Sequence, residues 1–240
     1  MTITHLLLDI EGTTCPVSFV SEVLFPYAKQ SLSSYLNDHQ EDLDLKNILQ
    51  AAEREWDGDP SPDSIKLRQA TRNQNQNFID SIKVYFEHLI NVDRKSTALK
   101  DLQGKIWDNG YRKGEITSHL FNETTECLKR WHRRQLSLSV YSSGSIQAQK
   151  LLYRHTNGGD LEHLFDHWFD THTGNKKECE SYRKIAEALH VSCEEVFFLS
   201  DSVPELDAAS EAGCSVGLAV RDELPENPNA YPIYNDFVDL

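Results

Sequence analysis

The chain has 240 residues, 39% of them hydrophobic and 26% charged, which is sufficient to bury the core of one large domain or two small ones. Its formal net charge of −14 excludes a general nucleic-acid binder, which needs a basic surface, and equally disfavours an anionic membrane surface as a partner. No apolar run is long enough to span a membrane, no secretory pattern opens the chain, and the five cysteines lack metal-ligand spacing, so we expect a cytoplasmic protein with reduced thiols.

The first predicted element is a short buried strand over residues 3–10, which leads into the stretch LLLDIEGTTCP, residues 6–16. Two acids, Asp9 and Glu11, stand one residue apart at the end of this strand. In an extended chain, residues 9 and 11 point to the same side, so both carboxylates face one group if the strand geometry continues to Glu11. Two acids this close need a compensating cation, or one of them is driven to protonate. Nearby Cys15 is expected to be a packing residue, because the neighbouring acids raise the pKa of its thiol.

Residues from about 20 to 130 are predicted to be helical, because apolar side chains recur every three or four residues. The stripes with this spacing are Leu24, Ala28, Leu32 and Leu36; Phe78, Ile82, Tyr85, Phe86 and Leu89; and Leu99, Leu102 and Ile106. The polar stretch DGDPSP, residues 57–62, predicts a loop inside this block. Phe19, Phe25 and Tyr27, near the start of the block, are assigned to interior packing, with the lining of an apolar ligand pocket as the alternative.

Strands and helices alternate from residue 136 onward. Strands are predicted over 136–141, 167–170, 196–201 and 214–220, and helices over 146–155, through Tyr182, Ile185, Ala186 and Leu189, and over 204–213. This alternation predicts an α/β fold with a doubly wound, mostly parallel sheet that helices cover on both faces. The expected domains are a Rossmann-like core, residues 1–18 and 132–240, and a helical cap, residues 19–131, inserted after the first strand.

Several polar residues follow the predicted strands, and in an open α/β sheet ligands bind beyond the carboxyl ends of the strands. These residues are Asp9 and Glu11, Ser142 and Ser143 in YSSGS, Lys176 and Lys177 in a glycine-containing loop, and Ser200 and Asp201. Carboxylates are ligands that Mg²⁺ prefers, hydroxyl and backbone N–H groups hold phosphate oxygens, and a lysine offsets charge. Taken singly, an Asp or Ser is more often a helix cap and a Lys a surface charge, so it is the combination that predicts a magnesium and phosphate site.

The order of these four elements resembles the haloacid dehalogenase superfamily. Four stretches resemble, more closely, the enolase-phosphatases of methionine salvage: DIEGTT, YSSGS, ESYRKIA (residues 180–186) and FLSD. The likeness extends over essentially the whole chain, including the helical block and its segment LQGKIW. Most superfamily members have Asp at the second acid position, and the Glu of DIEGTT is a mark of this subgroup.

The resemblance implies a haloacid dehalogenase-like core and a role for each matching residue. Asp9 is the implied nucleophile, which forms an aspartyl-phosphate, and Glu11 the implied general acid and base. One Mg²⁺ per chain is implied on the Asp9 side chain, the Glu11 backbone carbonyl and Asp201. Ser142, Ser143 and Lys176 are implied to hold the phosphoryl oxygens, with Lys176 preferred to Lys177 by its place in the motif. Glu205 is left with two readings, a support for the metal or Lys176, and a surface acid in a first helical turn.

The implied substrate is a small phosphorylated diketone, 2,3-diketo-5-methylthiopentyl 1-phosphate. The family enolises it and then removes phosphate, giving 1,2-dihydroxy-3-keto-5-methylthiopentene. The enolase step has no visible motif, and Glu11 is the first candidate for its base. The resemblance also suggests a monomer.

Three alternatives are weighed beside this reading. One is a superfamily phosphatase of another small phosphorylated metabolite, without the enolase step. Another is a dehalogenase, which has no need of Glu11 or Asp201. The last is an inactive binding module, ranked lowest because all the expected catalytic residue types are present.

Overall fold

The computed structural model describes residues 2–74, 77–225, 228 and 231–240. By their contacts, these residues form two compact units. The first contains the residues up to Val20 together with Ile116–Leu240, and the second contains Ser21–Glu115. The first unit is called the sheet unit and the second the helical unit below.

In the sheet unit, the described residues form six strands that are all parallel, in the order β3-β2-β1-β4-β5-β6. The strands are β1 (His5–Leu8), β2 (Ser137–Tyr141), β3 (His167–Phe169), β4 (Val196–Ser200), β5 (Ser215–Ala219) and β6 (Ile233–Tyr234). Every residue of β4 is buried, as expected for a strand that is covered on both faces. The predicted α/β fold with a parallel sheet is therefore confirmed.

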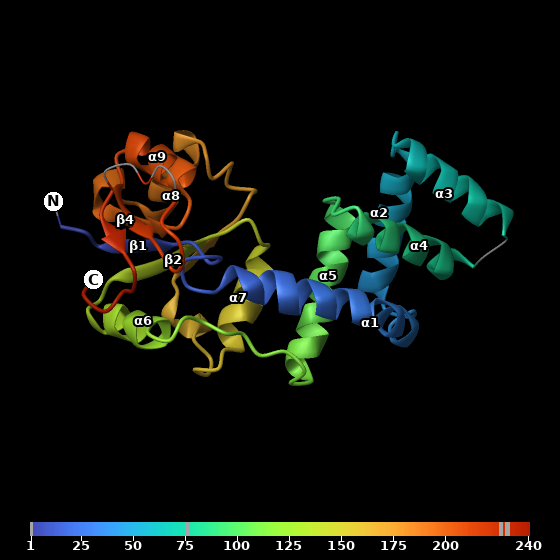
Figure 1. Ribbon diagram of the computed structural model, residues 1–240, viewed down its shortest axis with the longest axis horizontal. Helices are drawn as coiled ribbons and strands as arrows, with labels where there is room; N and C mark the ends of the chain where they lie inside the picture. Colours follow the sequence, from blue (N-terminus) through green and yellow to red (C-terminus); the bar gives the residue numbers. More distant parts are fainter. Residues whose placement is uncertain (1, 75–76, 226–227, 229–230) are drawn as a thin grey trace. The chain divides into compact units, whose positions relative to one another are not determined.

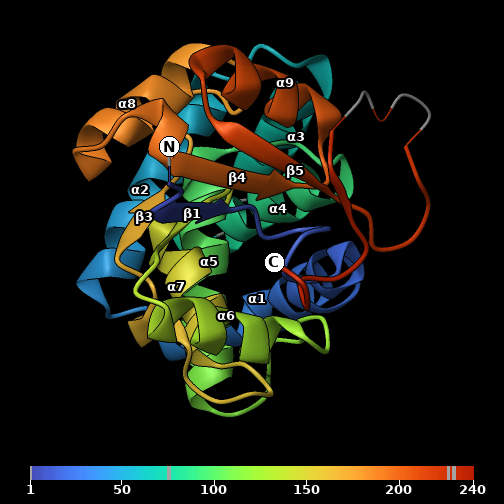
Figure 2. The same cartoon turned by 90° about the vertical axis from the view of Figure 1, so that its left-hand side faces the viewer.

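Helices cover both faces of this sheet: α8 and α9 lie on one face, α6 and α7 on the other (Figures 1 and 2). Their bounds are α6 (Thr124–Arg133), α7 (Ile146–Arg154), α8 (Cys179–Leu189) and α9 (Val203–Ala212), with short 3₁₀ turns at Glu162–Leu164 and Cys193–Glu195. The core between α8, α9 and the sheet includes Leu7, Tyr182, Phe198 and Leu206, each at most 1% exposed. The alternation of strands and helices predicted after residue 136 is present, and the predicted boundaries differ from the observed ones by at most one residue.

In its described residues, the helical unit has five α-helices, preceded by a six-residue π-helix that starts two residues before the unit boundary. Their bounds are η1 (Phe19–Leu24), α1 (Phe25–Asp38), α2 (Leu43–Asp57), α3 (Pro62–Asn73), α4 (Phe78–Asn91) and α5 (Thr97–Arg112). The predicted apolar stripes lie in its interior except for Phe78, which is 42% exposed. In this interior the Trp56 and Tyr85 rings stack with centroids 4.9 Å apart. The two ends of the unit are joined by the Tyr27 hydroxyl, which donates a 2.6 Å hydrogen bond to Glu115.

The boundary between the two units differs from the predicted division into a cap of residues 19–131 and a core formed by the remaining residues. Residues 116–131, including most of α6, belong to the sheet unit by their contacts. The reason is the buried face of α6: its Trp131 packs on the ring of Phe237, and the Cys127 thiol donates to the Phe237 carbonyl at 3.3 Å.

Among the described residues, no helix has both the length and the apolar character needed to cross a membrane.

Candidate active site

The register of the sheet brings three loops to one edge. Leu8 at the end of β1 pairs with Val140 of β2 and with Leu199 of β4. Because the strands are parallel, the residues that follow each of these positions leave the sheet at the same edge. Asp9 therefore lies between the loop that starts after Tyr141 and the loop that starts after Ser200.

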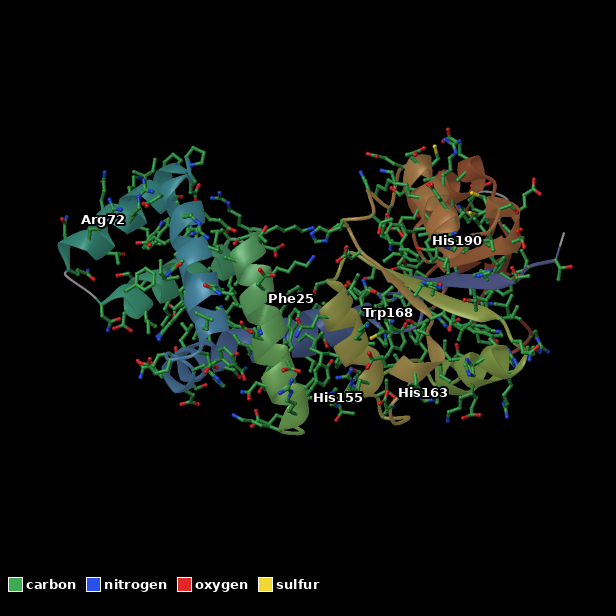
Figure 3. All side chains as sticks on the ribbon, turned by 180° about the vertical axis from the view of Figure 1, so that it is seen from behind. Phe25, Arg72, His155, His163, Trp168 and His190 are labelled. Atoms are coloured by element: carbon green, nitrogen blue, oxygen red, sulfur yellow. The ribbon has the colours of Figure 1, made fainter. Side chains whose placement is uncertain are left out.

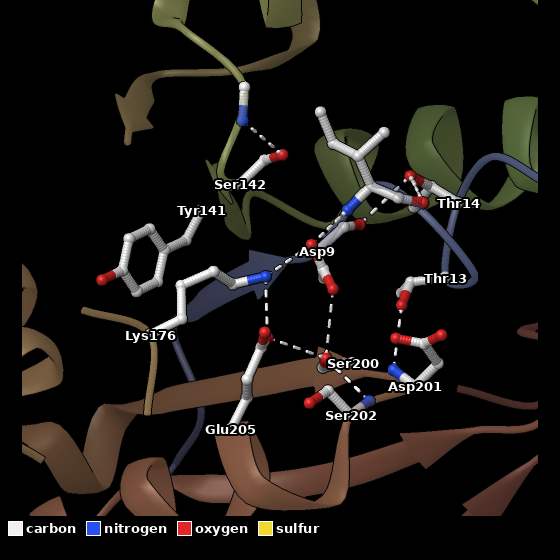
Figure 4. Close-up of polar contacts among 12 residues, drawn as sticks. Asp9, Thr13, Thr14, Tyr141, Ser142, Lys176, Ser200, Asp201, Ser202 and Glu205 are labelled. Atoms are coloured by element: carbon white, nitrogen blue, oxygen red, sulfur yellow. Dashed lines mark hydrogen bonds and ion pairs between the residues drawn. The ribbon is translucent and has the colours of Figure 1, made fainter. Parts of the chain in front are cut away.

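Asp9 is almost completely buried, and polar groups hold its carboxylate (Figure 4). Its Oδ1 accepts a 2.8 Å hydrogen bond from the backbone N–H of Ile10 and lies 2.7 Å from the Lys176 ammonium. Its Oδ2 accepts a 3.1 Å hydrogen bond from the Ser200 hydroxyl. The backbone N–H of Asp9 continues the sheet by donating to the Leu199 carbonyl at 3.0 Å. Asp9 is thus held in one orientation from three sides.

Lys176 bridges two carboxylates. Its Nζ lies 2.7 Å from Asp9 and 2.7 Å from Glu205, with its side chain 10% exposed. Burial alone would lower the pKa of this lysine, but the charges of Asp9 and Glu205 outweigh it and raise the pKa above its usual value. Lys177 is exposed. The preference for Lys176 over its neighbour therefore agrees with the geometry.

Glu205, on the first turn of α9, orients Lys176 instead of pointing into solvent. Besides the ion pair, it accepts a 3.1 Å hydrogen bond from the Ser200 hydroxyl, which also contacts Asp9. Burial and the charge of Asp9 raise the pKa of Glu205, while Lys176 opposes the shift. Of the two readings for this residue, the structure therefore favours support of Lys176. Ser200, the serine of FLSD, received no role in the sequence-based prediction.

Asp201 is held beside the DIEGTT turn. Its backbone N–H donates to the Thr13 hydroxyl at 3.1 Å, and its carboxylate packs directly over Gly12. A Cβ added to Gly12 would lie 2.0 Å from Asp201 Oδ2, and Gly12 also has a positive φ of 71°, so glycine is required on both counts. Burial, then the negative charges of Asp9 and Glu205, raises the pKa of Asp201 to about 6.

The loop after β2 carries the two predicted phosphate-binding serines. Ser142 is buried, and its Oγ accepts a 3.3 Å hydrogen bond from the Gly144 N–H, whereas Ser143 is exposed. The buried amide of Gln149, on α7, donates to the carbonyls of Gly144 at 2.8 Å and Phe169 at 2.9 Å, and at 3.5 Å to Ser142. Gln149 therefore fixes this loop against β3, a function that the sequence-based reasoning did not assign.

Two tyrosines fix the loop that carries Lys176. The Tyr182 hydroxyl donates to the Lys176 carbonyl at 2.7 Å, and the Tyr141 hydroxyl donates to the Gly174 carbonyl at 3.0 Å. The Lys176 ammonium also lies 5.8 Å from the centre of the Tyr141 ring. Both tyrosines were expected only as apolar members of a strand and a helix, because a single hydroxyl leaves the periodicity unchanged.

The turn at Glu11 differs from the expected geometry. β1 ends at Leu8, and the Ile10 carbonyl accepts hydrogen bonds from the N–H groups of Thr13, Thr14 and Cys15. The chain therefore turns after Ile10, and the condition attached to the shared orientation of residues 9 and 11, a strand that continues to Glu11, is not met. Glu11 is half-buried and forms an isolated β-bridge with Cys15.

The packing predictions near this turn have mixed outcomes. Cys15 is fully buried, and burial and then the charge of Glu11 raise the pKa of its thiol to about 12, so its role in packing is confirmed. Phe19 is 2% exposed, as predicted for a packed ring. Phe25 is 46% exposed (Figure 3), so for this ring the assignment to interior packing is wrong. Tyr27 is half-buried and uses its hydroxyl for the bond to Glu115.

The acidic residues fit a divalent cation by their charge. Asp9, Asp201 and Glu205 bring three carboxylates around the ammonium of Lys176, and after burial their mutual repulsion contributes to the raised pKa of Asp201. Mg²⁺ is usually bound by one or two carboxylates completed by other oxygen ligands. In the part of the chain that the structure describes, no three acidic, histidine or cysteine side chains converge in a metal-binding geometry. The set Asp9, Asp201 and the Glu11 carbonyl needs only two such side chains.

Comparisons with known proteins agree with this geometry. Residues 3–213 match the family model of the haloacid dehalogenase-like hydrolases. The chain is 80% identical over its full length to enolase-phosphatase E1 of Parasynechococcus marenigrum, covering 98% of that protein, and 52% identical over 93% of its length to enolase-phosphatase E1 of Prochlorococcus marinus, covering 91% of it.

Among solved structures, it is similar to the UTR4 protein of Saccharomyces cerevisiae, with a TM-score of 0.74, 32% identity and complete coverage of both chains. The CbbY protein of Rhodobacter sphaeroides shares the fold, with a TM-score of 0.58 at 19% identity over all of this chain and 96% of that one. The family-model match and the identity to curated relatives lead to one conclusion: the chain belongs to the enolase-phosphatases, within the haloacid dehalogenase-like hydrolases.

Proposed function

We propose that the protein converts 2,3-diketo-5-methylthiopentyl 1-phosphate, through its enol phosphate, into 1,2-dihydroxy-3-keto-5-methylthiopentene and phosphate. The observation that carries the proposal is the buried Asp9 carboxylate, held by Lys176 and Ser200 at the carboxyl end of the central strand. A nucleophilic carboxylate needs a fixed direction of attack and a nearby cation for the charge of the phosphoryl group. The 80% identity to an enolase-phosphatase over the whole chain supports the choice of substrate.

Phosphoryl transfer begins at Asp9 in this mechanism. One carboxylate oxygen of Asp9 attacks phosphorus, the bond from phosphorus to the C1 oxygen breaks, and an aspartyl-phosphate forms. Lys176, oriented by Glu205, offsets the charge on the transferring group, and Ser142 and Ser143 bind its oxygens. Bound Mg²⁺, held by Asp9, Asp201 and the Glu11 carbonyl, would supply further charge neutralisation at the phosphoryl oxygens.

Glu11 moves the protons. It protonates the leaving oxygen as Asp9 attacks, and then removes a proton from the water that hydrolyses the aspartyl-phosphate. It is also our candidate for the enolisation base, which takes a proton from the carbon next to a carbonyl before phosphate leaves. Its half-buried position on the turn after Asp9 keeps it within the same loop as the nucleophile.

The helical unit is proposed to act as the cap of this family, recognising the apolar methylthio tail. The monomeric state, one Mg²⁺ per chain and a cytoplasmic location remain predictions. A phosphatase of another small metabolite that lacks the enolase step remains the alternative.

The test follows both half-reactions with the diketo phosphate in Mg²⁺ buffer. Enol phosphate formation is read by stopped-flow ultraviolet absorbance, and phosphate release by a colorimetric assay. The wild-type protein is expected to give a transient absorbance and then stoichiometric phosphate. Asp9→Asn is expected to form the enol phosphate without releasing phosphate, and Glu11→Gln to lose both steps. Glu187→Gln, which neutralises an exposed acid on α8, is the matched control.

The possible results separate the two functions. Phosphate release without any transient absorbance would favour the alternative phosphatase. Phosphate release that persists unchanged in Asp9→Asn contradicts the aspartyl-phosphate mechanism.

A further inference from the structure

Arg221 lies at the same edge of the sheet as the acidic cluster, yet it belongs to none of the matching motifs. It follows β5 by two residues, and its side chain is only 6% exposed. A buried guanidinium is costly unless it is paired and hydrogen-bonded throughout. The identity of its partners therefore indicates what its burial achieves.

The guanidinium donates two hydrogen bonds to one backbone atom of the DIEGTT turn, the carbonyl oxygen of Thr13. Its Nε donates to the Thr13 carbonyl at 2.9 Å, and its Nη2 donates to the same oxygen at 2.6 Å. Its Nη1 contacts Glu123 at 2.5 Å and donates to the Asn235 carbonyl at 3.1 Å. Two donors in a rigid planar group fix an acceptor more tightly than a single flexible donor does.

The same guanidinium lies within cation–π distance of two aromatic rings. Its central carbon lies 4.3 Å from the centre of the Phe121 ring and 4.1 Å from the centre of the Phe237 ring. These two attractive contacts add to the hydrogen bonds that hold the guanidinium in place. Phe237 belongs to the C-terminal segment, which is itself anchored because Arg130 donates to the Phe237 carbonyl at 2.6 Å.

Thr13 connects the Arg221 guanidinium to the acids of the site. Its hydroxyl accepts from the Asp201 backbone N–H at 3.1 Å, and its own N–H donates to the Ile10 carbonyl at 3.2 Å. Gly12, the residue before it, packs against the Asp201 carboxylate. A shift of the Thr13 carbonyl would therefore move the turn that follows Asp9 and packs against Asp201, including the Glu11 carbonyl.

We propose that Arg221 is a positioning residue. By holding the Thr13 carbonyl, it keeps the turn after Asp9 in the conformation that places Glu11 and Asp201 correctly for binding the cation and the phosphoryl group. The contacts of Arg221 are with the Thr13 and Asn235 carbonyls, Glu123 and two aromatic rings, so it acts on the site through Thr13. The proposal rests on the proposed phosphatase function for its catalytic consequence, whereas its consequence for cation binding can be measured without substrate.

The experiment compares Arg221→Met and Arg221→Lys with the wild-type protein. Arg134→Met is the matched control, because Arg134 also contacts the C-terminal segment, through the Leu240 carbonyl at 3.4 Å, but lies away from the turn. Three quantities are measured: the Mg²⁺ dissociation constant by calorimetry without substrate, kcat and KM separately with the diketo phosphate, and the melting temperature. Binding and kinetics are recorded well below the lowest melting temperature.

Arg221→Met is expected to weaken Mg²⁺ binding about tenfold and to lower kcat by about 10- to 100-fold, with KM changed less than about threefold. Arg221→Lys is expected to recover part of both losses, because an ammonium can still donate to the Thr13 carbonyl but cannot stack as a plane. Arg134→Met should match the wild-type protein in Mg²⁺ affinity and kcat.

A lower melting temperature with wild-type Mg²⁺ affinity and wild-type kcat would overturn the proposal, since Arg221 would then only stabilise the fold. If Arg221→Met does not fold, Arg221→Lys decides by the same two readouts. A wild-type protein that fails to release phosphate refutes the proposed function instead, and the Mg²⁺ affinities of the variants still decide the role of Arg221.

Discussion

Replacing Lys176 with Met tests the charge balance of the site most directly. Met keeps most of the length of the stem beside Tyr141 but removes the ammonium that lies 2.7 Å from each of two carboxylates. At an effective dielectric constant of about 20, each contact is worth ~6 kcal/mol of gross attraction. Most of this is offset by desolvation, and breaking a buried pair by removing one partner costs about 3–5 kcal/mol. We therefore expect the free energy of unfolding to fall by about 3–5 kcal/mol at pH 8.

The stability lost in Lys176→Met is expected to depend on pH in a definite direction. In the variant, Asp9 and Glu205 face each other without a cation, so the pKa of Glu205, already raised in the wild-type protein, rises further. A carboxyl whose folded-state pKa exceeds its unfolded-state value destabilises the fold increasingly as the pH rises between these two values. The loss of stability should therefore be largest at pH 8 and should shrink at pH 5, where Glu205 can protonate.

Denaturant unfolding of the metal-free protein at both pH values measures this effect, and phosphate release measures the catalytic one. The rate constant kcat is expected to fall by about 10²–10³-fold, as for the loss of one preorganised charge-stabilising group. Lys177→Met is the matched control, since that neighbouring lysine is exposed. A stability loss below about 0.5 kcal/mol at pH 8, or an equal loss at both pH values, would refute the charge-balance argument.

Three further predictions concern the surroundings of Asp9. Asp201→Asn should raise the melting temperature of the metal-free protein more at pH 7.5 than at pH 4.5, because an acid whose folded-state pKa is raised to about 6 costs stability progressively as the pH rises from its unfolded-state value to that pKa; scanning fluorimetry at both pH values checks this. Gly12→Ala should destabilise the protein by about 2 kcal/mol or more and abolish phosphate release, since its Cβ would displace the Asp201 carboxylate; wild-type activity would refute this. Gln149→Met should raise the inhibition constant for phosphate about tenfold while leaving Mg²⁺ affinity unchanged.

The strands and their carboxyl ends were predictable, because apolar runs that end on an acid are visible in the chain without any knowledge of distant contacts. The strand before Asp9 and the strand before Asp201 both follow this pattern, and parallel pairing then brings the two acids to one edge. The two-residue strand β6 escaped prediction because Ile233–Tyr234 is too short for periodicity to register.

The supports of the site were harder to predict. Gln149 and Arg221 donate hydrogen bonds to backbone carbonyls that lie far from them in the sequence. Because every residue type has a backbone carbonyl, such a bond leaves no trace in the sequence at the accepting residue. What the sequence did not reveal about the turn after Ile10 is that three N–H groups share one carbonyl there. The exposure of Phe25 depends on which helix face is covered, which spacing alone does not determine.

The hydrogen bond between Tyr27 and Glu115 bears on how the chain folds. Before β1 can pair with β2, the chain must close a loop of about 130 residues, and the entropic cost of closure grows with the logarithm of loop length. Once the helical unit has formed and this bond joins its ends, the flexible part of the loop shrinks to about 40 residues. Closure then costs about 1 kcal/mol less. Early folding of the inserted helices would therefore speed the pairing of the central strands, and with it the assembly of a site whose residues are scattered along nearly the whole chain.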